Sequence, residues 1–164
     1  MKIQIIKSIV VILFVAIACL AFKFPRSAES EVSYPEGYRR WTHIKTGLVT
    51  ADNPNFKTNG GYHHIYGNDK AMEGYESGKF PDGSIIVFDL LDAKVQNGNI
   101  QEGERKHLDV MTKDNAKYPD TGGWGYEEFN GDRHTERALT PAAKTQCFTC
   151  HAKKDDFVFS EFRK

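Results

Sequence analysis

The chain is poor in cysteine, with three among 164 residues, and it has no excess of either charge. Its 22 basic and 22 acidic side chains cancel, so nothing in the composition indicates binding to nucleic acid or to an anionic membrane surface. It also lacks internal repeats and low-complexity segments. About 130 residues beyond the N-terminal segment are enough for one domain with a sizeable core.

A long apolar run, which is a feature of targeting segments, lies at the start of the chain. Lys2 and Lys7 precede a 14-residue apolar run over residues 9–22, which is short for a bilayer span and typical of an export signal. We expect residues 1–30 to be a signal peptide or a membrane anchor, with lipidation at Cys19 as a further alternative. Residues 31–164 would then be the exported domain, periplasmic or membrane-anchored.

The two remaining cysteines belong to one motif, Cys147-Phe148-Thr149-Cys150-His151. Two thiols at this spacing can add across the vinyl groups of a haem, and the adjacent imidazole can then reach the iron from one face. This C-x-x-C-H pattern predicts haem c with its iron as the cofactor, bound by Cys147, Cys150 and His151, with His151 as the metal ligand. A disulfide or a redox-active C-x-x-C pair is the alternative.

The position of the motif favours some cytochromes over others. Small electron carriers place it early and supply a methionine ligand from downstream, whereas here 13 residues follow His151 and none is methionine. Met111 is expected to pack in the core. The four-helix cytochromes c′ do carry a C-terminal motif, but the strand signals of this chain argue against a helical bundle.

The hydrophobic pattern predicts an α+β domain with an antiparallel sheet and five or six strands. A short helix follows Asn68 and ends at Gly78, and a second helix, which carries the haem motif, begins at Thr140 and Pro141. Residues 96–103 read as a polar connection. The expected strands are residues 41–49, 62–66, 84–91 (the central one), 106–112, 122–129 and 156–162.

Several segments in order resemble the cytochrome P-460 family, which includes the cytochromes c′-beta, and the resemblance spans residues 34 to the end. The resemblance implies the fold and a covalently bound haem, and it implies a dimer. The segments are residues 34–41 (Tyr-Pro-Glu-Gly-Tyr-Arg-Arg-Trp), 60–66 (Gly-Gly-Tyr-His-His-Ile-Tyr), 78–84 (Gly-Lys-Phe-Pro-Asp-Gly-Ser), 121–125 (Thr-Gly-Gly-Trp-Gly) and 147–151.

The resemblance leaves the activity open between two classes. Members that oxidise hydroxylamine carry a lysine cross-linked to the porphyrin, and this chain has Phe88 at the corresponding strand position. It therefore looks more like cytochrome c′-beta, in which phenylalanines cap the distal iron face, with Phe56 as a candidate second cap. An apolar distal pocket would favour nitric oxide and carbon monoxide as ligands. The expected protein binds such gases or passes electrons to an unknown redox partner; the alternative is an oxidoreductase acting on hydroxylamine or a peroxidase.

For other side chains, the sequence gives weaker evidence of a role at the haem. Trp124 follows a glycine-rich segment and is expected to pack against the haem or in the core. His63 and His64 are neighbours on a strand and so point to opposite faces, which prevents joint chelation of one metal. Glu127 and Glu128 could accept a proton near the haem, but a solvated strand end is the expected role.

Overall fold

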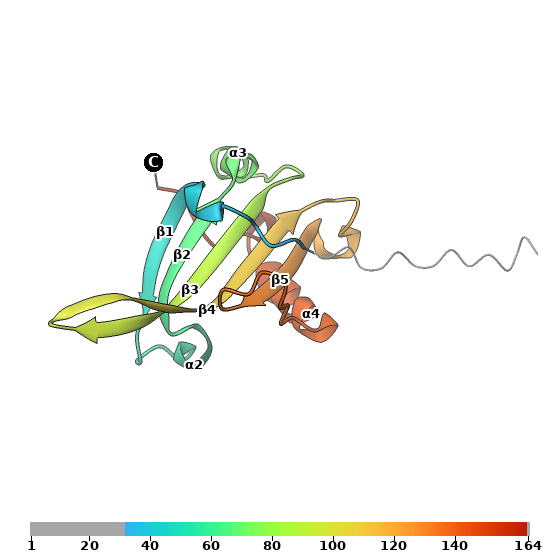
Figure 1. Cartoon of the computed structure of the whole chain (residues 1–164). Helices are drawn as coiled ribbons and strands as arrows, with labels where there is room; N and C mark the ends of the chain where they lie inside the picture. Colours follow the sequence, from blue (N-terminus) through green and yellow to red (C-terminus); the bar gives the residue numbers. More distant parts are fainter. Residues whose placement is uncertain (1–31, 164) are drawn as a thin grey trace, which may run out of the picture. The chain divides into compact units, whose positions relative to one another are not determined.

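The computed structural model describes residues 32–163, and these residues form a five-stranded antiparallel sheet in which each strand pairs with the next along the chain (Figure 1). The strands are β1 (Thr42–Val49), β2 (Gly61–Gly67), β3 (Ile85–Gln96), β4 (Asn99–Lys113) and β5 (Trp124–Asn130). The helices are α2 (Phe56–Asn59), α3 (Asp69–Ser77) and α4 (Pro141–His151), with short 3-10 turns at η1 (Tyr38–Arg40), η2 (Pro119–Thr121) and η3 (Asp155–Phe157). The predicted α+β class is confirmed.

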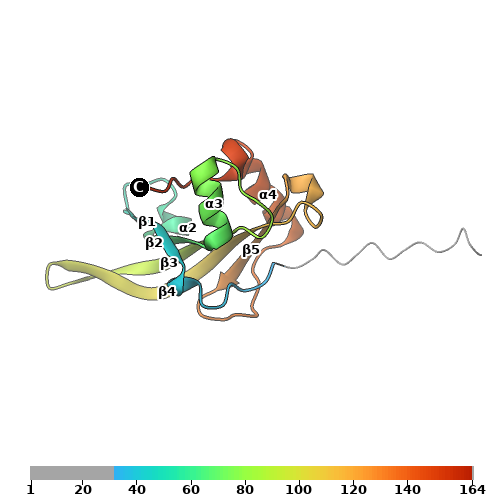
Figure 2. The ribbon, with the colours of Figure 1, turned by 90° about the horizontal axis from the view of Figure 1, so that it is seen from above.

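The central strand β3 divides the core into two halves, one on each face of the sheet. On one face Val87 packs with Tyr38 of η1 and Phe129 of β5. On the other face Ile86 packs with α3 and with Trp124, and Figure 2 shows α3 and α4 on the same side of the sheet. Because both faces of β3 are covered, its sequence reads as a continuous apolar run.

The helix boundaries follow from local capping chemistry, as predicted. The Asn68 side chain accepts a hydrogen bond from the Ala71 amide at 2.9 Å, and Gly78 ends α3 with φ of 79°. The Thr140 hydroxyl accepts from the amide of Ala143 at 3.2 Å, and proline occupies the first position of α4. These caps satisfy amides that a helix start leaves without intrahelical partners.

The prediction of a polar connection over residues 96–103 was wrong. Strands β3 and β4 continue into this region and form a hairpin that extends beyond the neighbouring strands in Figure 1. Its turn consists of Asn97 (φ 52°) and Gly98 (φ 78°), between the paired residues Gln96 and Asn99. Two successive positive φ values are the requirement of the tight turn that Asn-Gly favours.

The last predicted strand, residues 156–162, was also wrong. Residues Asp155–Phe157 form the turn η3, and the chain after it belongs to none of the five strands. Asp156 and Phe157 have φ values of 41° and 65°, so the backbone leaves the extended conformation that a strand requires.

The expected export signal or anchor at residues 1–30 lies outside the described residues. Within residues 32–163, no helix combines the length and the apolar character needed to cross a membrane.

Candidate functional site

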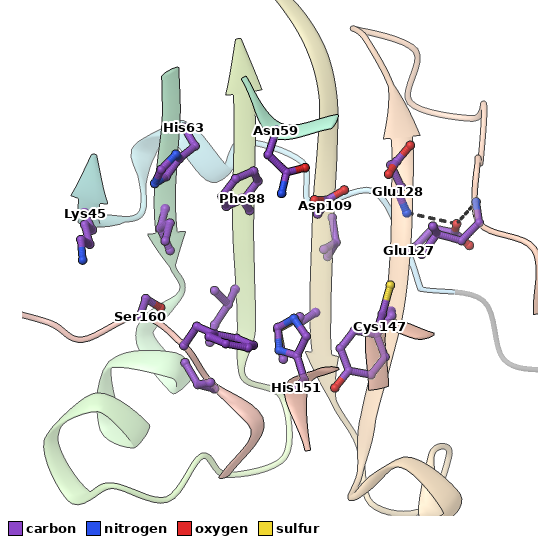
Figure 3. Close-up of a pocket in the computed structure, with 18 residues that line it drawn as sticks. Lys45, Asn59, His63, Phe88, Asp109, Glu127, Glu128, Cys147, His151 and Ser160 are labelled. Carbon is purple, nitrogen blue, oxygen red and sulfur yellow. Dashed lines mark hydrogen bonds between the residues drawn. The ribbon is translucent and has the colours of Figure 1, made fainter. Parts of the chain in front are cut away.

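A cavity of about 450 Å³ lies between the sheet face that carries Ile86 and the C-terminal part of the chain (Figure 3). Its lining comes from all five strands, from α2 and α4, and from the segments on either side of α4. A volume of this order is typical of cofactor and small-molecule sites.

The floor of the cavity is a row of cross-strand partners, one from each strand. Residues paired in register project to the same face of a sheet. A second, parallel row of cavity-lining residues lies two residues further along the strands and contains Ile86, Met111 and Tyr126. In register order the first row is Lys45, Ile65, Phe88, Asp109 and Glu128.

His151 is the last residue of α4 and lines the cavity. Its Nδ1 lies 2.7 Å from the carbonyl oxygen of Phe157. A carbonyl only accepts, so Nδ1 carries the proton and the Nε2 lone pair remains available to a metal. Burial lowers the pKa of His151, against an opposing effect of the Phe157 hydrogen bond, which favours the neutral imidazole that metals bind.

The two cysteines of the motif lie on α4 and are not joined to each other. Cys147 lines the cavity, while Cys150, three residues further along the helix, is exposed. Burial raises the pKa of the Cys147 thiol, and Asp109 and Glu128 raise it further. A redox-active C-x-x-C pair needs the opposite shift, because the thiolate is the reactive form. The partly buried position of Cys147, near two acids, therefore argues against the redox alternative.

The cavity lining fits a haem attached at this motif. Cys147 and His151 line the cavity, and Cys150 follows Cys147 one helical turn later. Two further cavity-lining groups, the Tyr126 hydroxyl and Nδ1 of His63, are buried without a hydrogen-bond partner among residues 32–163. Buried polar atoms of this kind are rare in proteins, and a bound polar group in the cavity would explain them.

Phe88 and Phe56, the two candidate caps of the distal iron face, differ in their position relative to the cavity. Phe88 lines the cavity and stacks on the ring of His63 at 4.9 Å between centroids. Phe56 instead lies on α2, is 42% exposed and does not line the cavity. Figure 3 shows four polar residues around Phe88 at one end of the cavity: Lys45, Asn59, His63 and Asp109. His151 lies toward the other end.

Asp109 and Glu128 form an acidic pair at the floor of the cavity. Burial raises the pKa of Asp109 well above its usual range, and the neighbouring carboxyl of Glu128 raises it further. Asp109 therefore keeps its proton to a higher pH than a solvated aspartate. His107 lies beside the pair, with Nε2 3.6 Å from the Asp109 carboxylate. Asp109 was not among the residues predicted for the site, although a charged residue two positions before Met111 on a core strand was a visible signal.

Glu127 does not lie at a solvated strand end, and that expectation was wrong. It is only 2% exposed, and its carboxylate accepts from Lys144 Nζ at 3.2 Å and Arg137 Nη1 at 3.3 Å. The Leu139 amide donates to the same carboxylate at 3.3 Å. Glu127 thereby joins β5 to the beginning of the helix that carries the haem motif.

Trp124 is fully buried and is not among the residues that line the cavity. Its indole Nε1 donates to the backbone carbonyl of Asp156 at 3.1 Å. Trp124 therefore supports the segment that follows α4.

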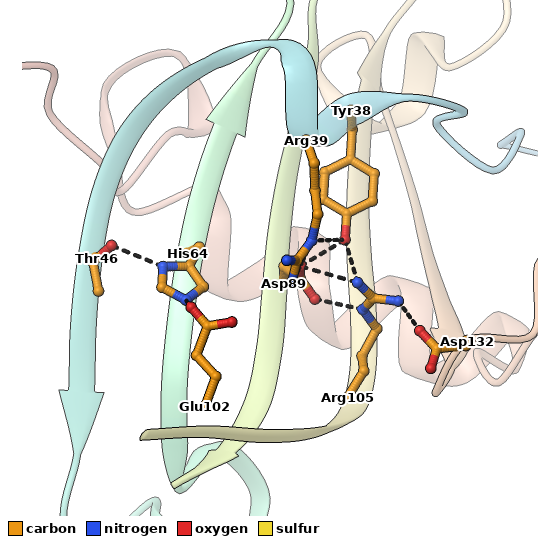
Figure 4. Close-up of polar contacts among 8 residues, drawn as sticks. All are labelled: Tyr38, Arg39, Thr46, His64, Asp89, Glu102, Arg105 and Asp132. Atoms are coloured by element: carbon orange, nitrogen blue, oxygen red, sulfur yellow. Dashed lines mark hydrogen bonds and ion pairs between the residues drawn. The ribbon is translucent and has the colours of Figure 1, made fainter. Parts of the chain in front are cut away.

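The opposite face of the sheet carries a separate polar network (Figure 4). The fully buried carboxylate of Asp89 accepts hydrogen bonds from Tyr38 at 2.6 Å, Arg105 at 2.6 Å and Arg39 at 2.8 Å. His64 also lies on this face, between Thr46 and Glu102. The prediction that His63 and His64 point to opposite faces is confirmed.

The sheet, the cavity and the terminal helix with its two thiols and imidazole define a haem protein of the c type on an antiparallel sheet. The family model of Cytochrome P460 matches residues 35–160. The chain therefore belongs to the cytochrome P460 family, whose members bind haem c with iron and are typically exported. No curated protein matches the chain.

Proposed function

We propose that the protein is an exported mono-haem c-type cytochrome with an open distal iron position that binds a small gaseous ligand, such as nitric oxide or carbon monoxide, and transfers electrons. Cys147 and Cys150 would hold the haem through thioethers, and His151 would be the axial ligand. Haem c bound in this way supplies an iron that takes up one small ligand and exchanges one electron.

The observation that carries the proposal is the position of Phe88 in the middle of the cavity floor. It occupies the β3 position at which hydroxylamine-oxidising relatives are expected to carry the cross-linking lysine, and a phenyl ring forms no such bond. The ring of Phe88 with His63 stacked upon it would restrict the distal side to small molecules.

The polar groups around Phe88 favour a second candidate, a haem oxidoreductase acting on hydroxylamine or peroxide. Asp109 and Glu128 can hold and pass on a proton at the cavity floor. Among the residues that line the cavity Lys45 is the only lysine, and it comes from β1 rather than β3. An amine at this place could substitute for the missing lysine only if it formed a covalent tie to the macrocycle.

Titration of the reduced exported protein with nitric oxide tests the first proposal. We expect the visible spectrum to change with saturation at one ligand per haem. A six-coordinate spectrum that nitric oxide leaves unchanged would reject the open distal position. The variants Lys45→Met and His63→Leu then identify the side chain that occupies the iron, because only the responsible variant would regain ligand binding.

Mass spectrometry of the haem peptide separates the two candidates. For the gas-binding cytochrome we expect attachment through Cys147 and Cys150 and nothing more. A third covalent tie, to Lys45 or to any other residue, together with turnover of hydroxylamine, would favour the oxidoreductase. A pyridine haemochrome assay on the same material checks that haem is attached at all.

A further inference from the structure

The segment after α4 turns back toward the cavity through an unusual backbone conformation. Asp156 and Phe157 have successive φ values of 41° and 65°, in the left-handed region that side chains other than glycine rarely adopt. Such a conformation persists only where surrounding contacts hold it. The contacts that hold this one converge on Asp156.

Three groups from other parts of the fold bind Asp156. The amide of Phe80 donates to Oδ2 at 2.5 Å, Lys113 Nζ approaches Oδ1 at 3.1 Å, and Trp124 Nε1 donates to the backbone carbonyl at 3.1 Å. The ion pair is largely shielded, with the Lys113 side chain 7% exposed and the Asp156 side chain 16% exposed. In a partly dry environment such a charged pair fixes its geometry more firmly than it would at the surface.

The ring of Phe157, the next residue, packs closely against the backbone at Gly122. A Cβ atom at Gly122 would lie 2.2 Å from its Cζ, so only glycine leaves room for the ring. Lys113 also donates to the Gly122 carbonyl at 2.9 Å and lies 5.9 Å from the centre of the Phe157 ring. The same lysine therefore restrains both sides of the turn.

The consequence of this arrangement is the position of one carbonyl group. The Phe157 oxygen, one residue beyond Asp156, lies 2.7 Å from Nδ1 of His151. A hydrogen bond at the second ring nitrogen sets the tautomer and orientation of a metal-binding histidine and raises its basicity.

We infer that Asp156 is a positioning residue for the axial histidine, acting through the Phe157 carbonyl. The inference rests on the proposed role of His151 as the iron ligand and is independent of which small molecule binds opposite to it. The buried pair with Lys113 holds the turn, the turn holds the carbonyl, and the carbonyl keeps the His151 ring aligned and electron-rich.

The test compares Asp156→Ala with Asp155→Asn in the haem-loaded protein. Asp155 is the adjacent, exposed acid at the start of η3, so its variant removes a charge at nearly the same place but leaves the contacts of the Asp156 side chain intact. We expect Asp156→Ala to lower the iron–histidine stretching frequency in the resonance Raman spectrum of the ferrous protein. The reduction potential should rise, because a less basic imidazole stabilises ferric iron less. Asp155→Asn should leave the stretching frequency unchanged.

Two further variants control for misfolding of Asp156→Ala. Asp156→Asn keeps an oxygen that can accept from the Phe80 amide but loses the ion pair, and Lys113→Met loses the pair from the other side. Both should lower the stretching frequency, as Asp156→Ala does, with circular dichroism unchanged. Unchanged values in folded Asp156→Asn and Lys113→Met would overturn the inference.

The axial assignment itself is tested separately by His151→Gly with added imidazole. If His151 is the ligand, the iron–histidine band disappears in the variant and returns with imidazole. If the band survives in His151→Gly, the proposed axial role fails. If it disappears there but does not respond to Asp156, the proposed function stands and the positioning role fails.

Discussion

The neighbouring glutamates on β5 are expected to respond in opposite ways to loss of charge. Glu127 is buried in contact with Lys144 and Arg137, whereas Glu128 lies against another acid, Asp109. The change to glutamine keeps the size of each side chain, removes its charge and replaces one acceptor oxygen with an NH2 donor. We expect Glu127→Gln to destabilise the fold and Glu128→Gln to leave it unchanged or more stable.

The expected cost of Glu127→Gln follows from its contacts. Removal of one partner of a buried ion pair costs about 3 to 5 kcal/mol. Here Lys144 and Arg137 retain 20% and 28% exposure of their side chains, so water can solvate them when the carboxylate is gone. Glutamine also keeps an acceptor for the Leu139 amide. We therefore expect a loss of about 2 kcal/mol in the free energy of unfolding.

Urea unfolding of the haem-loaded protein at neutral pH, followed by circular dichroism, measures both effects. With a slope of about 2 kcal/mol per molar urea, Glu127→Gln should lower the midpoint by about 1 M. Glu128→Gln should keep or raise the midpoint, because the Glu128 carboxylate faces another acid, Asp109, and not a buried cation. Equal losses in the two variants, or no loss in Glu127→Gln, would refute the argument that Glu127 anchors the start of α4 to β5.

Three further predictions concern the cavity and the network behind it. Phe88→Ala should raise the association rate of carbon monoxide several-fold in stopped-flow experiments, because the ring restricts the distal side; an unchanged rate would place the barrier elsewhere. Because burial and Glu128 raise the pKa of Asp109, the reduction potential should fall by up to about 59 mV per pH unit as this carboxyl ionises. Asp109→Asn should remove that slope in potentiometry between pH 5 and 9. Burial alone would raise the pKa of Asp89, but Arg105 and Tyr38 outweigh it and lower the pKa below its usual value. The stabilisation from Asp89 is therefore present above about pH 4, where a free aspartate ionises, and is lost as pH falls through the lowered pKa. Asp89→Asn should cost about 3 kcal/mol at pH 7 and flatten the acid limb of the stability curve; a curve parallel to wild type would contradict this.

Features encoded by adjacent residues could be predicted from the sequence. The caps at Asn68 and Thr140, the apolar central strand and the attachment motif each depend on a few neighbouring positions, and the structure has the helices and β3 where those signals lie. The turn of the β3–β4 hairpin also depends on two adjacent residues, Asn97 and Gly98. It was overlooked because the polar residues around it resemble a loop, although Asn-Gly between paired strands is a strong turn signal.

The lining of the cavity could not be predicted in the same way, because strand register brings it together. Lys45, Phe88 and Asp109 come from three strands far apart in the sequence, and they share one row only through the pairing of β1 to β4. The turn at Asp156 was missed for a related reason. Residues 156–162 alternate like a strand, but contacts from Phe80, Lys113 and Trp124 favour a left-handed backbone over local preference.

The polar network around Asp89 on one face of the sheet supports the cavity on the other face. Asp89 of β3 and Arg105 of β4 are joined by hydrogen bonds on the face opposite the cavity, and η1 adds Tyr38 and Arg39 to the same carboxylate. A slip of one residue between β3 and β4 would break these bonds and turn Phe88 away from the cavity, because side chains alternate between the faces. The buried carboxylate therefore specifies the register that sets Phe88 beside Asp109. It follows that the chemistry of the distal side depends on a charged cluster that never touches the cavity.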